Sequence, residues 1–278
     1  ARGHYVWRDF LSFLDAYDRV CRALKTARDF GEVMYAYLKD AAAEGAVYVE
    51  MFCSPERPKA LGIGYDAWLS ALEDGIDRAR RDFAIEGRII VVCIRHLGPE
   101  RALALVEAMV AQPHPYVVGF GMGGDEAKFS PVDFAPAFRM AHSHGYGCTI
   151  HAGEVRGPES VWASIRDLPV ARIGHGVRSA EDPRLLEELA RRGTVLEVCP
   201  GSNVALGLYR DRDEHPLHRL IARVALPVGI RRAQQLEGFE APRGRHVRAE
   251  AEVDEGLAIL DGVAGDGLRS EERRIGKE

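Results

Sequence analysis

The stretch that decides the fold of this chain is GCTIHAGE, residues 147–154. It begins as a short apolar run, which is typical of a buried strand, and it ends on an imidazole and a carboxylate separated only by two small residues. Downstream, the stretch RIGHG at residues 172–176 again places a histidine where an apolar run ends. Two strands that both end on histidine indicate a barrel whose reactive groups gather at one mouth.

Working outward, six strand-like runs alternate with helical segments along the chain. The runs cover residues 47–52, 88–94, 116–120, 148–151, 171–175 and 195–199. Between them apolar residues recur every three or four positions, as at Trp68, Leu72, Ile76 and Ala79, which predicts amphipathic helices. Continuous apolar strands separated by helices are typical of a parallel sheet covered by helices.

Polar and glycine-rich residues cluster directly after these strands. Examples are Ser54-Pro55-Glu56, Arg95-His96 and Pro200-Gly201-Ser202-Asn203. In a (βα)₈ TIM-type barrel such positions form the carboxyl-terminal mouth, where chemistry is located. An open, doubly wound sheet would also alternate strands and helices, but no glycine-rich phosphate loop opens a helix here. We therefore predict the α/β barrel.

Bulk composition sets limits on the partners. The chain has 278 residues, a net charge of −5 and 46% hydrophobic residues, so no basic face predicts a nucleic-acid partner. The longest apolar runs have strand length, which predicts no membrane partner. Five cysteines form no CxxC pair, and no signal peptide is visible, so we expect reduced thiols and a cytoplasmic protein. The oligomeric state stays open.

His151 and Glu154 are the first candidates for chemistry. In the functional interpretation, His151 is a zinc ligand and Glu154 is a proton donor or acceptor beside the metal-bound water. The alternative is a half-buried histidine followed by an exposed loop glutamate. That alternative would be favoured for an isolated His-x-x-Glu, but the position at a strand end favours the functional interpretation.

His175 lies between Gly174 and Gly176, which indicates a backbone that passes close to another group. Its imidazole could act as a base or hold a water molecule, and the alternative is a hydrogen-bonded core histidine. The segment 119–126 has many glycines but lacks the lysine of a P-loop. It predicts either backbone contact with a flat ligand, supported by Asp125 and Glu126, or a simple tight turn.

The other cysteines and histidines are interpreted as structural. Cys199 has no adjacent base and is predicted to be a buried thiol beside a turn. The histidines at positions 4, 114, 142, 144, 215, 218 and 246 fall on helix faces or in loops, and we expect them to be structural or solvated.

Taken together, these residues resemble the adenosine deaminase family, which belongs to the metal-dependent amidohydrolase-like barrels. The resemblance covers roughly residues 5–228, and its motifs follow the family's order. The motifs are Ser54-Pro55, Cys93-Ile94-Arg95-His96, Gly124-Asp125-Glu126, His151-Ala152-Gly153-Glu154, Ile173-Gly174-His175-Gly176 and Glu197-Val198-Cys199-Pro200.

The resemblance implies a barrel with one catalytic Zn²⁺ and hydrolytic deamination of adenosine or 2′-deoxyadenosine. By the same resemblance, His151 corresponds to a zinc-binding histidine, and Glu154 protonates the ring nitrogen next to the attacked carbon. His175 orients the zinc-bound water and helps to deprotonate it, and Gly124 contacts the purine through its backbone. Zinc would lower the pKa of that water to about 7.

The chain departs from the family pattern at both ends. The family's first strand carries a His-x-His pair, and this chain has no such pair at a strand end. The family's eighth strand ends in paired aspartates, and in this chain Gly229-Ile230-Arg231-Arg232 stands in their place. His142 and His144 have the spacing but a helical setting, and only Asp261 offers a substitute. We therefore expect an incomplete barrel in which strands two to seven are recognisable, strand one is absent and strand eight is altered.

These departures define two domains and two functional hypotheses. Residues 1–228 are the predicted barrel, and residues 229–278 a divergent, charged, weakly structured segment. We interpret the missing start as a truncation and the altered end as a frame change or a divergence.

The first hypothesis is a zinc aminohydrolase of purine salvage, with adenine or a modified purine as alternative substrates. The second is a catalytically defective barrel that binds a purine or another partner. With one zinc-binding histidine, we expect weak zinc binding and slow deamination.

Overall fold

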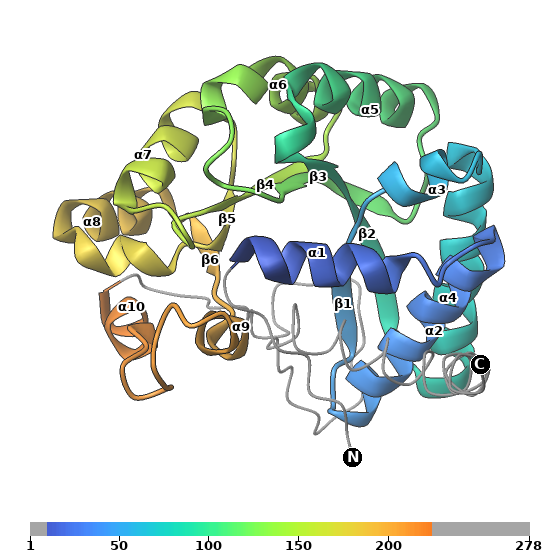
Figure 1. Ribbon diagram of the computed structural model, residues 1–278, viewed down its shortest axis with the longest axis horizontal. Coiled ribbons are helices and arrows are strands. Elements are labelled where there is room, and N and C mark those ends of the chain that lie inside the picture. Colours follow the sequence, from blue (N-terminus) through green and yellow to red (C-terminus); the bar gives the residue numbers. More distant parts are fainter. Residues whose placement is uncertain (1–9, 224–278) are drawn as a thin grey trace, which may run out of the picture.

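The computed structural model describes residues 10–223. Within them, parallel strands form a six-stranded sheet in the order β1-β2-β3-β4-β5-β6. The sheet curls, and helices cover its outer side as an arc (Figure 1). The predicted incomplete TIM-type barrel is therefore confirmed. The strands are β1 (Tyr48–Cys53), β2 (Glu86–Ile94), β3 (Val117–Gly123), β4 (Gly147–Ala152), β5 (Arg172–His175) and β6 (Val195–Glu197).

The helices follow the periodicity of the sequence. Trp68, Leu72, Ile76 and Ala79 are all buried on one side of α4. The helices are α1 (Phe10–Cys21), α2 (Ala27–Ala43), α3 (Glu56–Ala60), α4 (Tyr65–Phe83), α5 (Pro99–Ala111), α6 (Ala135–Ser143), α7 (Pro158–Asp167), α8 (Pro183–Arg192), α9 (Pro200–Ala205) and α10 (Leu217–Arg223). Short 3₁₀ turns are η1 (Arg95–Leu97), η2 (Pro131–Phe134) and η3 (Val177–Glu181).

Local sequence signals explain where these helices begin and end. The α8 helix starts at Pro183, which fits a first turn because proline has no N–H to leave unbonded. The Asp182 side chain caps it by accepting from the backbone N–H of Arg184 at 2.9 Å. Gly193, in the left-handed conformation, ends the helix.

The predicted end of the third strand is wrong. The sequence indicated a strand that ends near Phe120, whereas β3 continues to Gly123. Glycines at positions 119, 121 and 123 weaken a strand signal because they add no side-chain packing. Here they leave room inside the barrel: a Cβ on Gly121 would lie 3.1 Å from the Phe52 ring and 3.3 Å from a methyl group of Thr149.

Charged side chains join distant strands inside the curled sheet. Arg172 on β5 contacts Glu50 on β1 at 2.6 Å and Glu197 on β6 at 3.1 Å. Thr149 on β4 donates to Glu197 at 2.7 Å. Because β1 and β5 are not neighbours in the sheet, the Arg172–Glu50 pair requires the sheet to be curved.

The hydrophobic core lies between the outer face of the sheet and the helices. Phe120 on β3, Ile150 on β4 and Phe138 on α6 are fully buried there. Burial of each such side chain contributes about 1.5–3 kcal/mol. The five cysteines are free, as predicted. No helix in the described part of the chain combines the length and apolar composition needed to cross a bilayer.

Several predictions fall outside residues 10–223. They concern the altered eighth strand at residues 226–232, the boundary at residue 228, the charged segment 229–278 and the substitute ligand Asp261.

Candidate active site

The carboxyl ends of β4 and β5 bring His151, Glu154 and His175 together. In the register of the two strands, His151 lies beside Gly174, and Ala152 lies beside His175. The rings of His151 and His175 meet edge to face, with centroids 5.0 Å apart. Gly174 permits this approach, because a Cβ there would lie 2.9 Å from Nδ1 of His151.

Two hydrogen bonds orient His151, one made by its ring and one by its backbone carbonyl. Its Nδ1 lies 3.1 Å from the carbonyl oxygen of Met122 on β3, and a carbonyl only accepts, so Nδ1 carries the proton. The lone pair is therefore on Nε2. Arg95, the first residue of η1 directly after β2, is 1% exposed and donates from Nη2 to the His151 carbonyl at 2.7 Å. The ring of His151 is held from the neighbouring strand β3, and its backbone is held from the segment after β2, two strands away in the sheet.

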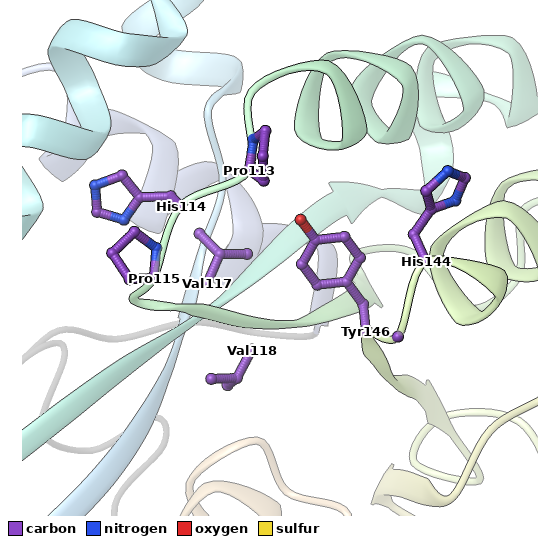
Figure 2. A pocket seen from close by; sticks show the side chains of 8 residues that line it. Pro113, His114, Pro115, Val117, Val118, His144 and Tyr146 are labelled. Atoms are coloured by element: carbon purple, nitrogen blue, oxygen red, sulfur yellow. The ribbon is translucent and has the colours of Figure 1, made fainter.

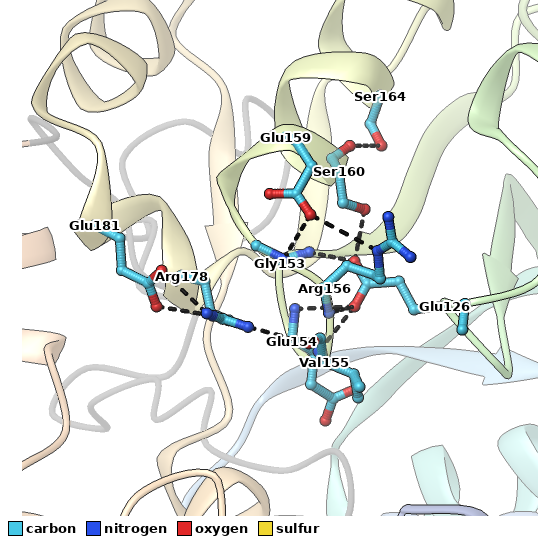
Figure 3. A network of polar contacts seen from close by, with 12 residues as sticks. Glu126, Gly153, Glu154, Val155, Arg156, Glu159, Ser160, Ser164, Arg178 and Glu181 are labelled. Carbon is cyan, nitrogen blue, oxygen red and sulfur yellow. Dashed lines mark hydrogen bonds and ion pairs between the residues drawn. The ribbon is translucent and has the colours of Figure 1, made fainter.

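The loop that carries Glu154 wraps around the buried carboxylate of Glu126. One oxygen of Glu126 accepts from the backbone N–H of Gly153 at 2.5 Å and from the Ser160 hydroxyl at 2.6 Å. The other accepts from the N–H groups of residues 154, 155 and 156 at 3.2, 2.8 and 2.8 Å. Figure 3 shows these bonds converging on Glu126. Because charge-assisted hydrogen bonds are the strong ones, this carboxylate fixes the loop.

The Glu154 carboxyl is buried, and its proton affinity is high. Glu154 is only 5% exposed. Burial raises the pKa of Glu154 to about 7; the negative charge of Glu126 acts in the same direction, and His151 opposes both. A carboxylic acid that is still partly protonated near neutral pH can donate a proton to a bound ligand.

His175 occupies a strained position beside Glu154. Its φ of +58° lies in the left-handed region, which costs about 1–3 kcal/mol for a residue other than glycine and is typical of functional sites. Its Nε2 is 3.5 Å from Oε1 of Glu154. Burial lowers the pKa of His175 to about 4. Near neutral pH the imidazole is uncharged, so this contact is a polar contact rather than a salt bridge.

Gly124 lies directly after β3, at the same edge of the sheet. Its φ is +97°, and a Cβ there would be 3.0 Å from Nδ1 of His96. The backbone N–H of Asp125 donates to the same nitrogen at 3.4 Å. This geometry requires glycine at position 124, and the contact of Gly124 with a purine stays a prediction.

Comparison with known proteins agrees with this geometry. The profile of the family described as adenosine deaminase matches residues 4–231. This chain belongs to the adenosine deaminase family. The adenine deaminase of Rhizobium leguminosarum bv. trifolii is 44% identical over 218 residues, which are 78% of this chain and 68% of that protein. The chain is thus an aminohydrolase-type enzyme that spans about two thirds of the length of this relative.

Solved structures of similar proteins share the fold. The crystal structure of adenine deaminase from Arthrobacter aurescens matches with a TM-score of 0.75 and 28% identity, over 79% of this chain and 67% of that one. An amidohydrolase from Burkholderia ambifaria with bound zinc matches with a TM-score of 0.68 and 32% identity, over 73% and 57% of the two chains.

The residues described for this deaminase-family chain do not form a zinc site. The lone pair of His151 lies on Nε2, the nitrogen that could bind a metal. However, within residues 10–223 no three His, Cys, Asp or Glu side chains are placed to hold a metal ion. His142 and His144 lie at the exposed end of α6, as the sequence indicated. A catalytic zinc takes about three protein ligands, so one histidine does not fit the ion.

A separate cavity lies near the starts of β3 and β4, and Figure 2 shows the side chains that line it. Its lining includes residues 113–115, which precede β3, and residues 144–146, which precede β4. The strands are parallel, so this is the amino-terminal edge, where conserved features of such barrels serve stability rather than catalysis. The cavity is therefore not continuous with the His151–Glu154 site.

Sequence reasoning missed three residues of the site. Arg95 was quoted only as part of a motif, and Asn203 only as part of a turn. His215 was interpreted as structural or solvated and proves to be buried, at 4% exposed. A polar strand end signalled Arg95, whereas no local pattern distinguishes Asn203 or His215.

Proposed function

We propose that the protein catalyses hydrolytic deamination of a 6-aminopurine, with Glu154 as the proton donor to the purine ring. In this reaction, oxygen from water replaces the exocyclic amino group, which leaves as ammonia. The observation that carries the proposal is the buried Glu154 carboxyl, whose pKa of about 7 keeps a proton available near neutral pH.

Protonation of the ring nitrogen beside the amino-bearing carbon makes that carbon electrophilic. Glu154 is suited to this step because a general acid works best when its pKa lies near the operating pH. The Glu126 carboxylate and the groups that donate hydrogen bonds to it, here called the Glu126 cradle, support the proposal. They hold the backbone on both sides of Glu154 and so limit the positions of its carboxyl group. A proton donor placed in advance loses little entropy on reaction.

The other predicted site residues have roles that follow from their positions. His175 faces Glu154 and would bind the attacking water or the developing hydroxyl group. Gly124 would contact the purine plane through its backbone. His151, with its free Nε2, would be one ligand of a metal. No step of the proposal runs through zinc, because the described residues do not hold it.

Adenine is the substrate that we propose first. The relative at 44% identity and the similar structure from Arthrobacter aurescens both bear the name adenine deaminase. Adenosine and 2′-deoxyadenosine are the second candidates, because the family profile bears the name adenosine deaminase and the motifs follow its order.

The test is conversion of the 6-aminopurine to the 6-oxopurine by the purified 278-residue chain in buffer supplied with zinc. Adenine, adenosine, 2′-deoxyadenosine and N6-methylated adenine are offered separately. We expect turnover of adenine and a loss of about 10²–10⁴ in kcat for Glu154→Gln, which removes the transferable proton while keeping the shape.

A matched control is Glu159→Gln. Glu159 lies in the same segment, but its side chain is 62% exposed, and it only accepts from the Gly157 N–H and pairs with Arg156. We expect this variant to retain activity. Equal activity of Glu154→Gln and wild type would overturn the role of Glu154. Purine binding without formation of a 6-oxopurine from any of the four substrates would favour a binding protein.

A further inference from the structure

A buried line of polar groups runs from His175 away from the site. Nδ1 of His175 is 3.2 Å from Nδ2 of Asn203, and Oδ1 of Asn203 is 3.0 Å from Nε2 of His215. Nδ1 of His215 accepts from the backbone N–H of Leu217 at 3.2 Å. His175, Asn203 and His215 are 2%, 0% and 4% exposed, so water does not compete for these bonds.

The Leu217 N–H gives this line a direction. A backbone N–H can only donate, so Nδ1 of His215 carries a lone pair and its proton lies on Nε2. That Nε2–H donates to Asn203, whose oxygen must face it. The amide nitrogen of Asn203 then faces His175 and donates to Nδ1. The remaining proton of neutral His175 therefore lies on Nε2.

This assignment requires a neutral His215, because both ring nitrogens of a protonated histidine donate. The contact with Leu217 opposes that state, because a protonated Nδ1 would face a second donor, and burial acts in the same direction by lowering the pKa of His215. Tautomers and amide orientations are otherwise ambiguous in a structure. Here the Leu217 N–H can only donate, and this fixes in turn the tautomer of His215, the amide orientation of Asn203 and the tautomer of His175.

We propose that Asn203 and His215 are positioning residues that keep the proton of His175 on Nε2, with the Leu217 N–H setting the polarity. Asn203 comes from α9 and His215 from the loop before α10, so the strand end of β5 depends on segments that follow it by 28 and 40 residues in the chain. The result is a donor on His175 directed at the Glu154 carboxyl, 3.5 Å away. Its kinetic consequence rests on the proposed function, whereas the tautomer itself does not.

The test is nitrogen NMR of the full chain carrying ¹⁵N-histidine, at mildly alkaline pH, with His175→Gln used to assign the signals. In wild type we expect a protonated Nε2 and an unprotonated Nδ1 on His175. Asn203→Asp has the same shape but only accepts, so we expect the proton of His175 to move to Nδ1. Wild type with the proton on Nδ1, or a folded Asn203→Asp with an unchanged tautomer, would overturn the proposal.

A second pair of variants covers the case in which Asn203→Asp does not fold. Leu217→Pro removes the polarising N–H at the first position of α10, where proline is tolerated, and Leu217→Ala retains it. We expect a mixed tautomer of His175 only in the proline variant. The same tautomer in both would contradict a role for the Leu217 N–H.

Kinetics then separates positioning from simple packing. If purine turnover is present, we expect Asn203→Asp to lower kcat by about 10²-fold or more with little change in KM. An absence of turnover in every variant would count against the proposed function, and the NMR result would still decide the tautomer.

Discussion

Glu154 shows how the surroundings of one residue create a reactive group. A glutamate in water is ionised at neutral pH, but burial penalises its charged form, and the nearby negative charge of Glu126 adds to the penalty. His151 opposes both effects on the pKa of Glu154, and burial lowers the pKa values of His151 and His175 themselves to about 4.

The raised pKa of Glu154 predicts the pH dependence of the enzyme. Because the pKa is shifted upward to about 7, the acid form dominates below that pH and is lost as pH rises through it. We expect kcat/KM for adenine to fall on the alkaline side with an apparent pKa near 7. The measurement is a pH profile, and a flat profile through neutrality would contradict the role of Glu154 as an acid.

The Glu126 cradle predicts a large effect from a small change. In Glu126→Gln an amide NH₂ would face backbone N–H groups that need an acceptor. We expect a loss of about 3 kcal/mol in the free energy of unfolding, because charged hydrogen bonds contribute about 1.5–3 kcal/mol each. Urea denaturation measures it. Ser160→Ala, which removes one donor and leaves the backbone bonds, should cost clearly less.

At the scale of elements, neighbouring strands set the position of the His151 ring. The register of β4 and β5 places Gly174 against one side of the ring, and Gly123 of β3 lies on another side. The site is therefore built mainly on the strands, which are the rigid part of the barrel.

Two alanine substitutions test this packing of the ring. A Cβ at position 174 would be 2.9 Å from Nδ1 of His151, whereas one at position 123 would be an ordinary 3.8 Å from the same ring. We expect Gly174→Ala to displace His151, destabilise the protein by about 1–3 kcal/mol and reduce activity. Gly123→Ala should be nearly neutral. Thermal unfolding and kcat measure both, and equal effects would argue against steric control by Gly174.

At the scale of the whole molecule, the curvature of the sheet depends on contacts across the barrel interior. Arg172 connects β5 to β1 and β6 through Glu50 and Glu197. Burial raises the pKa of Glu197, and the positive charge of Arg172 opposes that shift. Arg172 thus allows two acidic groups to share the interior of the curled sheet.

Replacement of Arg172 by leucine tests this arrangement. The variant leaves Glu50 and Glu197 without their shared cation, and we expect it to lose about 1–3 kcal/mol at neutral pH, less than for fully buried pairs because these groups are partly exposed. Without the opposing charge of Arg172 the pKa of Glu197 rises further, so part of the loss should be recovered as pH falls and this carboxyl becomes protonated. Denaturation at several pH values, with Arg172→Leu/Glu197→Gln as the rescue, decides it. A loss independent of pH would contradict the electrostatic cause.

The sequence by itself determined the six strands, the helices between them and the family. Apolar runs and three- to four-residue spacing are local signals, and they also identified His151, Glu154 and His175 as neighbours at strand ends. The tertiary structure alone decided the Glu126 cradle, the Arg172–Glu50 pair and the Asn203–His215 line. It also decided the pKa of Glu154. These features join residues that lie far apart in the chain or depend on burial, and neither property is written in any short stretch of sequence.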